Sequence, residues 1–197
     1  MKQIAQGAEA TIYEEKNKIT KLRKKKGYRL ETLDLKLRFS RARREAKILE
    51  KLQNAIDVPK LISLFGSRVE MEKLQGKQLR DVLNEKNCQK LCLEAGQKIG
   101  KMHDLGIIHG DLTTSNMMLS KGKVYFIDFG LSFFSSRIED MAVDLHVLKE
   151  TLKGKHNEIA ERCFDAVLKG YKKSKNSAEA IKRMEIVEAR GRYKGKY

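Results

Sequence analysis

The sequence is short of cysteine and of long apolar runs. Its 197 residues include 3 cysteines, an odd number that disfavours a disulfide framework and leaves reduced thiols as the expectation. No apolar stretch approaches the roughly 20 residues that a membrane-spanning helix needs. The opening residues, "MKQIAQGAEATIYEE", lack the basic segment, apolar block and cleavage site of a secretory signal. We therefore expect a cytoplasmic protein that folds without disulfide bonds or structural metals and does not enter a membrane.

Acidic residues are a minority. Lysine and arginine number 42 against 26 aspartate and glutamate residues, so the formal net charge is +16 and the pI is about 9.7. Such an excess attracts polyanions, and nucleic acid is the first candidate. A lysine-rich solubilising surface, or a basic face that docks an acidic protein, explains the charge equally well.

The first part of the chain is predicted to be mainly β with one helix. Alternating residues in "ATIYEE" and "NKITKLR" indicate a β-hairpin, and "KLISLFG" and "SRVEMEKL" indicate two more strands around a turn at Gly66 and Ser67. Between these pairs, residues 33–54 have the apolar spacing of one amphipathic helix. Pro59, the only proline, closes the loop that follows this helix.

After Leu74 the pattern becomes helical. Five segments are candidate helices: "QLRDVLNEK", "CQKLCLEAGQKIGKMHDLG", "EDMAVDLHVLKETL", "NEIAERCFDAVLKGYKK" and "AEAIKRMEIVEAR". The exception is a loop and hairpin over residues 107–130. We expect a β-rich lobe, residues 1–73, to meet a helical lobe, residues 74–197, and a junction of this kind commonly forms a ligand cleft.

Two motifs in the loop and hairpin over residues 107–130 resemble the catalytic segments of kinases. In "HGDLTTSN", Asn116 follows Asp111 at the five-residue offset between the catalytic Asp and the metal-binding Asn of the kinase loop. In "KVYFIDFGL", Asp128 opens an Asp-Phe-Gly tripeptide after a strand, where kinases place a magnesium ligand. A hairpin turn at Lys121 and Gly122 separates them. Asp111 is therefore the candidate catalytic residue, and Asn116 and Asp128 are candidate ligands for Mg²⁺ or Mn²⁺.

The first lobe offers weaker counterparts for binding ATP. Lys21 in "KITKLR" is the candidate phosphate-binding lysine, Ile19 lies on the same strand face, against the adenine, and Arg23 on that face is the rival cation. Glu45 in the helix is the candidate partner of Lys21. The alternative for Glu45 is a solvated charge on a charge-rich helix.

The nucleotide-covering turn is degenerate. In "AQGAEATI" only Gly7 of the usual glycines remains, and Ile12 takes the position of the usual Val. Glu9 at the tip would repel phosphates unless it binds a metal or a partner residue. In "VEMEKLQG", Met71 is expected at the back of the cleft, and residues from Glu72 to Leu74 are expected beside the adenine edge.

Other conspicuous residues have structural explanations. His103 and His109 are expected to be packing and hydrogen-bonding scaffolds, because the loop already has an acidic group for proton work. Asp144 is expected to accept hydrogen bonds from the backbone of the catalytic loop. Met117, Met118 and Met141 are expected to fill the core or line the cleft.

Together the segments "GAEATIY", "KGYR", "IIHGDLTTSN", "FIDFGLS", "EDMAVDLHVL" and "RGRYKGKY" resemble the small atypical kinase subunit of the KEOPS complex, over essentially the whole chain. The resemblance implies an α+β, minimal two-lobed protein-kinase-like fold with a truncated activation segment, related to RIO-type kinases. It also implies Mg²⁺- and ATP-dependent hydrolysis of ATP, or phosphorylation of Ser or Thr, coupled to threonylcarbamoylation of tRNA adenosine. The implied partners are the threonylcarbamoyl-transferase subunit, a further small subunit, and tRNA.

Gly110 stands where protein kinases usually carry the Arg that binds a phosphorylated activation segment. Here only "LSFFSSRI" separates Gly130 from the next helix. We therefore expect a kinase that is not switched by phosphorylation of Ser132, Ser135 or Ser136.

The end of the chain, about residues 190–197, is basic. Its candidate RNA-phosphate contacts are Arg190, Arg192, Lys194 and Lys196. The alternative is a frayed basic terminus without a role in binding.

Two other functions remain open from the sequence. An independent RIO-like Ser/Thr protein kinase would use the same site on protein substrates, although RIO-type kinases normally lack the Phe-Gly after the metal-binding Asp. A non-catalytic RNA-binding scaffold with a relic nucleotide pocket would not need Lys21, Asp111, Asn116 and Asp128 together.

Overall fold

The alternating segments near the N-terminus form a five-stranded antiparallel sheet. The computed structural model describes residues 1–7 and 9–193. The sheet contains β1 (Lys2–Gln6), β2 (Thr11–Glu15), β3 (Lys18–Leu22), β5 (Arg68–Glu72) and β4 (Leu61–Phe65), in that order. The predicted β2–β3 and β4–β5 hairpins are confirmed, and β1 adds an edge strand.

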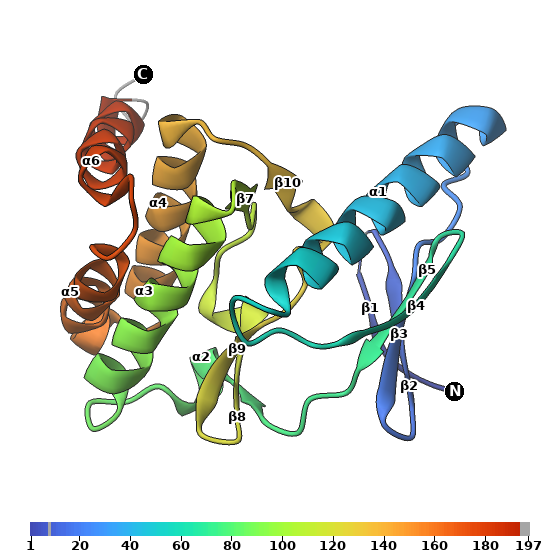
Figure 1. Ribbon diagram of the computed structural model, residues 1–197, viewed down its shortest axis with the longest axis horizontal. Helices are drawn as coiled ribbons and strands as arrows, with labels where there is room; N and C mark the ends of the chain where they lie inside the picture. The colour runs from blue at the N-terminus through green and yellow to red at the C-terminus, as the bar shows by residue number, and fades with distance from the viewer. Residues whose placement is uncertain (8, 194–197) are drawn as a thin grey trace.

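One long helix, α1 (Glu31–Leu52), crosses a face of this sheet (Figure 1). Its C-terminal half buries Ala42, Ala46, Leu49 and Leu52, as the apolar spacing predicts. The helix begins two residues before the predicted start, with Glu31 and Asp34 in its first turn, where carboxylates favour the N-terminal end of the helix dipole.

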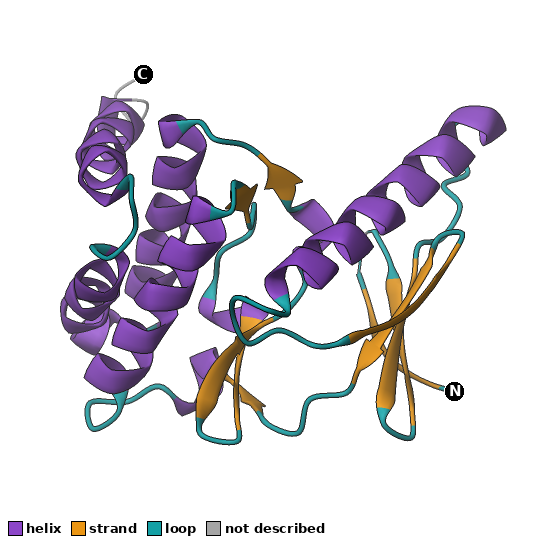
Figure 2. Cartoon of the chain, in the orientation of Figure 1, coloured by secondary structure: helices purple, strands orange, loops and turns teal. Residues whose placement is uncertain are grey.

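The second lobe is helical (Figure 2). It consists of α2 (Leu79–Val82), α3 (Cys88–Asp104), α4 (Ile138–Lys155), α5 (Ala160–Tyr171) and α6 (Ser177–Tyr193), with short 3-10 turns at Thr114–Asn116, Phe129–Leu131 and Asn157–Ile159. A β-carbon on Gly96 of α3 would lie 2.0 Å from the carbonyl oxygen of Val167 in α5. The two helices therefore cross with their backbones in close contact, which only glycine permits.

The predicted helix "QLRDVLNEK" is too long. Only Leu79–Val82 is helical, because the following asparagine side chains take over the backbone hydrogen bonds. The backbone N–H of Asn84 donates to Oδ1 of Asn87 at 2.9 Å, and the Asn87 amide donates to the carbonyl oxygen of Val82 at 2.8 Å. These local bonds end α2 after one turn.

Short strands between the lobes carry the chemical motifs. A three-stranded sheet contains β6 (Lys77–Gln78), β8 (Met117–Ser120) and β9 (Lys123–Phe126), and β7 (Ile107–Ile108) pairs with β10 (Phe133–Phe134). The predicted turn between β8 and β9 is confirmed, with positive φ at Lys121 and Gly122. No helix within residues 1–7 and 9–193 combines the length and apolar character that a bilayer crossing requires.

The two lobes are joined by a partly buried ion pair behind the cleft. Nζ of Lys98 on α3 lies 2.7 Å from Oδ2 of Asp57, in the loop after α1. The backbone N–H of Phe126 donates to the carbonyl oxygen of the same aspartate at 3.0 Å. These contacts fix the base of α1 relative to β9 and hence to the Asp128 segment.

Candidate active site

Two adjoining hollows form a cleft where the sheet meets the second lobe. The inner hollow, of about 410 Å³, is lined mainly by apolar side chains of the sheet, and the outer hollow, of about 220 Å³, by the turn after β1 and the catalytic segments. The two share Ile12, Lys21 and Asp128. The junction between the lobes, which the sequence predicted as a ligand site, therefore contains a cleft.

The predicted nucleotide-binding and catalytic residues converge on this cleft. The inner hollow is lined by Ile12, Ile19, Lys21, Glu45, Met71, Glu72, Leu74, Asn116 and Asp128, and the outer hollow by Gly7 and Asp111 among others. These residues come from six segments that are distant in sequence. Their functional roles remain predictions.

Lys21 links both sides of the cleft. Its Nζ lies 2.8 Å from Oε1 of Glu45 on α1 and 2.5 Å from Oδ1 of Asp128. Burial alone would lower the pKa of the ammonium, but the charges of Glu45 and Asp128 raise it above its ordinary value. Lys21 is therefore a stable cation at the border of the two hollows.

Glu45 is a buried ion-pair partner and not a solvated helix charge. Its side chain is 1% exposed, and its second oxygen, Oε2, forms an ion pair with Arg23. Arg23, the rival cation of the sequence analysis, is also buried and lines the outer hollow. Lys21 in β3 and Arg23 just after it therefore share one carboxylate.

Asp128 is held in an unusual backbone conformation. Its φ is +61°, in the left-handed region, and its Oδ1 accepts a hydrogen bond from the Gly130 N–H at 3.2 Å. Burial would raise the pKa of Asp128, but the charge and hydrogen bond of Lys21 lower it below its ordinary value. The carboxylate therefore remains ionised and reaches the edge of the cleft.

The catalytic loop orients Asp111 through Asn116. Nδ2 of Asn116 donates to Oδ2 of Asp111 at 2.7 Å and to its carbonyl oxygen at 2.9 Å. Since the amide nitrogen is used in this way, the amide oxygen of Asn116 is the atom left to bind a cation.

Asp144 on α4 supports the loop from beneath, as the sequence predicted. Its carboxylate accepts hydrogen bonds from the backbone N–H groups of His109, at 2.6 Å, and Gly110, at 2.9 Å. It also lies 3.3 Å from Nε2 of His103. Burial lowers the pKa of His109, whose Nε2–H donates to the carbonyl oxygen of Ile127. Both histidines are therefore scaffolds.

Gly110 is required by geometry. Its φ is +79°, and a β-carbon there would lie 2.6 Å from the carbonyl oxygen of Leu131. The activation segment is short, because α4 begins at Ile138, and the Oγ of Ser132 is buried and donates to the carbonyl oxygen of His109. The segment thus packs directly against the position where protein kinases usually carry Arg.

Arg41 is a site residue that the sequence analysis missed. It extends from α1 and forms an ion pair with Glu9 at the tip of the nucleotide-covering turn. Burial would raise the pKa of Glu9, but the hydrogen bond and charge of Arg41 lower it. The sequence did indicate that the carboxylate of Glu9 needs a positively charged partner. It could not identify Arg41 as that partner, because Arg41 lies 32 residues later on a helix that carries several arginines.

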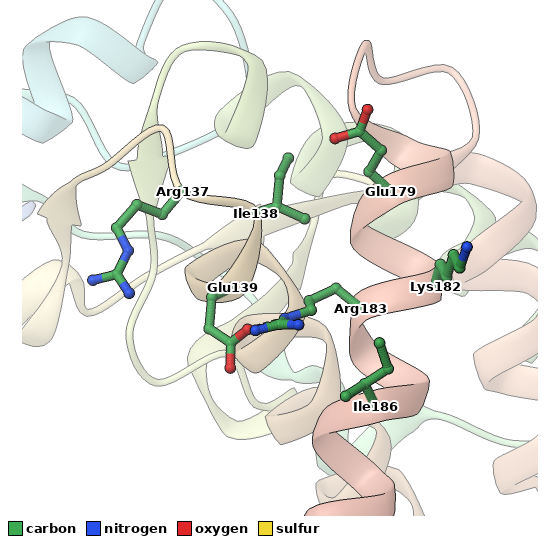
Figure 3. A pocket seen from close by; sticks show the side chains of 7 residues that line it. All are labelled: Arg137, Ile138, Glu139, Glu179, Lys182, Arg183 and Ile186. Atoms are coloured by element: carbon green, nitrogen blue, oxygen red, sulfur yellow. Dashed lines mark hydrogen bonds and ion pairs between the residues drawn. The ribbon is translucent and has the colours of Figure 1, made fainter.

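A third hollow, of about 490 Å³, lies between the start of α4 and α6, away from the cleft (Figure 3). It is lined by Arg137, Ile138, Glu139, Glu179, Lys182, Arg183 and Ile186, and the Arg183 guanidinium pairs with Glu139. Neither the catalytic loop, residues 109–116, nor the Asp-Phe-Gly tripeptide, residues 128–130, lines it. Asp111, Asn116 and Asp128 therefore all lie at the cleft and not at this hollow.

The residues of the cleft fit a hard divalent cation. Mg²⁺ takes oxygen ligands and is commonly held by one or two protein groups together with substrate phosphates. Asp128 supplies a carboxylate and Asn116 an amide oxygen to the same inner hollow. In residues 1–7 and 9–193 no group of three or more His, Cys, Asp or Glu side chains is placed to hold a metal.

The basic C-terminal segment is only partly described. Helix α6 runs to Tyr193, so the backbone of Arg190 and Arg192 is helical and not a separate tail. Lys194 and Lys196 lie outside the described residues. The RNA-binding role of these four residues remains a prediction.

Residues 7–137 match the family model of the RIO domain. The chain is 42% identical to the KEOPS complex subunit Bud32 of Pyrococcus abyssi, over 98% of this chain and 97% of the relative. It is 43% identical to the probable bifunctional tRNA threonylcarbamoyladenosine biosynthesis protein of Methanothermobacter thermautotrophicus, over 96% of this chain and 36% of that longer protein. Among solved structures, the Rio2 kinase–ADP/Mg²⁺–phosphoaspartate complex of Chaetomium thermophilum matches 96% of this chain and 70% of its own, with a TM-score of 0.65 at 15% identity. That last likeness supports the predicted two-lobed kinase fold.

Proposed function

The chain belongs to the RIO domain family, in its Bud32 branch, and we propose that it is the Mg²⁺- and ATP-dependent kinase/ATPase subunit of a KEOPS complex that threonylcarbamoylates tRNA. The observation that carries the proposal is the Lys21 ammonium held between Glu45 and Asp128, in the same cleft as Asp111 and Asn116. We also place the boundary between the lobes at residues 73 and 74.

The inner hollow accommodates the nucleoside. Ile19 and Met71 are cross-strand partners on β3 and β5 and offer apolar surface to the adenine, and residues 72–74 offer backbone groups to its edge. Lys21 stands between this hollow and the outer one, so it meets the phosphates where they pass from one to the other. Gly7 and Ile12 cover them from the first lobe.

Asp111 orients the attacking oxygen. It lines the outer hollow, and its side chain is fixed by the Asn116 amide, so a hydroxyl or a water entering from solvent can donate its proton to this carboxylate. Asp128 and Asn116 would hold Mg²⁺, which neutralises charge on the transferred phosphoryl group when bound. Lys21 and Arg23 are the two cations that line the outer hollow, beside the carboxylates of Glu9, Asp111 and Asp128.

The short activation segment limits the choice of acceptor. Between the Asp-Phe-Gly tripeptide and α4 there is room only for β10 and its flanking residues, without a platform for a substrate peptide. Water, or a hydroxyl presented by a partner subunit, is therefore the acceptor that we favour over a free protein substrate.

The proposed partners are the transferase subunit, one further small subunit, and tRNA. The relatives' names specify the KEOPS complex and tRNA threonylcarbamoyladenosine biosynthesis. The net charge of +16 suits a surface that works beside RNA. Arg190, Arg192, Lys194 and Lys196 are the contacts that we propose for tRNA phosphates.

A test of this proposal follows the γ-phosphate of labelled ATP with the purified protein, a transferase subunit and tRNA. We expect release as inorganic phosphate, stimulated by partner and tRNA together. Label retained on serine or threonine of a protein, with little free phosphate, would instead support the second candidate, an independent RIO-like protein kinase. No magnesium-dependent turnover of either kind would contradict both.

A further inference from the structure

Arg23 gives the buried carboxylate of Glu45 a second cation. Arg23 is 2% exposed and lies two residues after Lys21, on the same face of the β3 segment. Lys21 forms an ion pair with Oε1 of Glu45, and the Arg23 guanidinium forms one with Oε2. Each oxygen of this carboxylate therefore has its own positively charged partner.

The Arg23 backbone is anchored independently of Lys21. Its N–H donates to the carbonyl oxygen of Ser67 at 3.2 Å, and its own carbonyl oxygen accepts from Arg38 on α1 and from the Ser67 hydroxyl at 3.4 Å each. Arg23 is thus fixed to the β4–β5 turn, to α1 and to Glu45 at the same time. It holds α1 against the sheet whether or not Lys21 contacts Glu45.

Lys21, by contrast, is shared. It contacts Asp128 as well as Glu45 and borders both hollows. A β-carbon on Gly130 would lie 2.9 Å from Nζ of Lys21 and 3.6 Å from an Nη of Arg23, so the missing side chain leaves space for both cations over this residue. Lys21 is therefore the one of the two that has a second carboxylate partner.

We propose that Arg23 is a positioning residue: it keeps Glu45 paired and α1 docked, and thereby frees Lys21 to contact the phosphates of the substrate. The inference rests on the proposed function, because it assumes that ATP phosphates enter the cleft. Its physical basis is that a buried charge left without a partner is strongly unfavourable. With Lys21 as the only cation, Glu45 would compete with the phosphates for it; with Arg23 present, Lys21 can leave without stranding the carboxylate.

The proposal predicts that Glu45→Gln changes kcat/KM for ATP in opposite directions in the wild type and in Arg23→Gln. Glu45→Gln in the wild type should lower kcat/KM for ATP, because Arg23 loses the group through which it docks α1. In Arg23→Gln, where KM for ATP should rise about tenfold, adding Glu45→Gln should raise kcat/KM, because it removes the competitor for Lys21. We expect a coupling of about tenfold, within the range for residues in contact.

Two further variants separate positioning from general stability. Arg23→Lys keeps the charge and should retain more of the wild-type KM than Arg23→Gln does. Lys149→Gln is the control: Lys149 on α4 pairs with Glu188 on α6, lines neither hollow and has no contact with Arg23. It should lower the melting temperature and leave kcat/KM for ATP unchanged.

The experiment measures kcat, KM and melting temperature for these variants of the full chain under conditions where the wild type turns over ATP. If Glu45→Gln lowers kcat/KM by the same factor with and without Arg23, or if Arg23→Gln behaves like Lys149→Gln, the inference is wrong. Failure of the wild type to turn over ATP would instead contradict the proposed function. Should Arg23→Gln be too unstable to assay, Arg23→Met, which also removes the charge and keeps an unbranched side chain, replaces it with and without Glu45→Gln and must show the same reversal.

Discussion

The carbonyl oxygen of Leu131 lies 2.6 Å from the point that a β-carbon of residue 110 would occupy. The backbone of the activation segment therefore packs on the backbone of the catalytic loop at Gly110. Asp144 holds the same loop from the other side through the Gly110 N–H. From the sequence, Gly110 replaces the usual Arg because the short activation segment offers no phosphate to bind. The structure adds that a side chain at position 110 would collide with the Leu131 backbone.

Substituting Gly110 tests this close packing. We expect Gly110→Ala to lower the free energy of unfolding by about 1–3 kcal/mol, because alanine is strained at positive φ and meets the Leu131 carbonyl. Turnover should fall by about tenfold or more, because the loop that carries Asp111 must shift. Denaturant unfolding and steady-state ATP turnover measure the two effects.

Gly122 is the matched control. Its φ is +75°, close to that of Gly110, but nothing lies within 4 Å of a β-carbon there. Gly122→Ala should therefore show the strain without the loss of turnover. Equal effects of the two substitutions on turnover would show that packing against Leu131 is unimportant.

Asp111 is predicted to act on the chemical step and not on binding. Asp111→Ala should leave the ATP dissociation constant nearly unchanged while turnover falls at least about a hundredfold, the usual scale for a positioned acid or base. Equilibrium ATP binding and turnover, measured on the same preparation, check this. Parallel losses in both would rule out the assigned role.

Much of the fold was predictable because its signals are local. The β2–β3 and β4–β5 hairpins and the helical spacing of the C-terminal half of α1 were both confirmed. Burial alternates clearly along β5 but not along β2, β3 or β4. The length of α2 was not predicted. Asn84 and Asn87 have modest helix propensity on their own, and only their mutual hydrogen bonds, which depend on the turn, end the helix.

The site was predictable where a motif fixes both type and spacing of residues, as for the placement of Lys21, Asp111, Asn116 and Asp128 around one cleft. Partner choice was harder. Glu45 paired with Lys21 as predicted, but the simultaneous bond to Arg23, and the pairing of Glu9 with Arg41, depend on how α1 lies across the sheet. Periodicity locates a helix face but does not rank the arginines on it.

A pH effect is expected at the start of α1. Burial would raise the pKa of Asp34, but hydrogen bonds from Arg38 and the Lys26 N–H, and the charges of Arg38 and Arg29, lower it below its ordinary value. A carboxyl with a lowered folded-state pKa stabilises the fold above its unfolded pKa, and this stabilisation is lost as pH falls through the folded value. Asp34→Asn should therefore be less stable than the wild type at neutral pH, and the gap should close below about pH 4. A constant gap from neutral to acidic pH in denaturant unfolding would contradict the prediction.

The C-terminal basic residues are predicted to contact RNA phosphates. Replacing Arg190, Arg192, Lys194 and Lys196 with glutamine should reduce the slope of log affinity for tRNA against log salt by about 0.7–0.9 for each phosphate that the variant no longer binds. A charge-matched variant with four exposed lysines replaced elsewhere, at Lys60, Lys86, Lys90 and Lys121, should change the slope less. Equal slopes for the two variants would exclude a direct role for the C-terminal segment.

The most direct test of the central claim is a magnesium titration of ATP turnover by the purified chain, comparing the wild type with Asp128→Asn. If the cleft is a phosphoryl-transfer site, wild-type turnover rises with Mg²⁺ and saturates, and Asp128→Asn loses at least about a hundredfold at every concentration, the scale for removing a group that stabilises transition-state charge. A variant that retains wild-type turnover and magnesium dependence would show that the chemistry does not pass through Asp128, and the account of the site would be wrong.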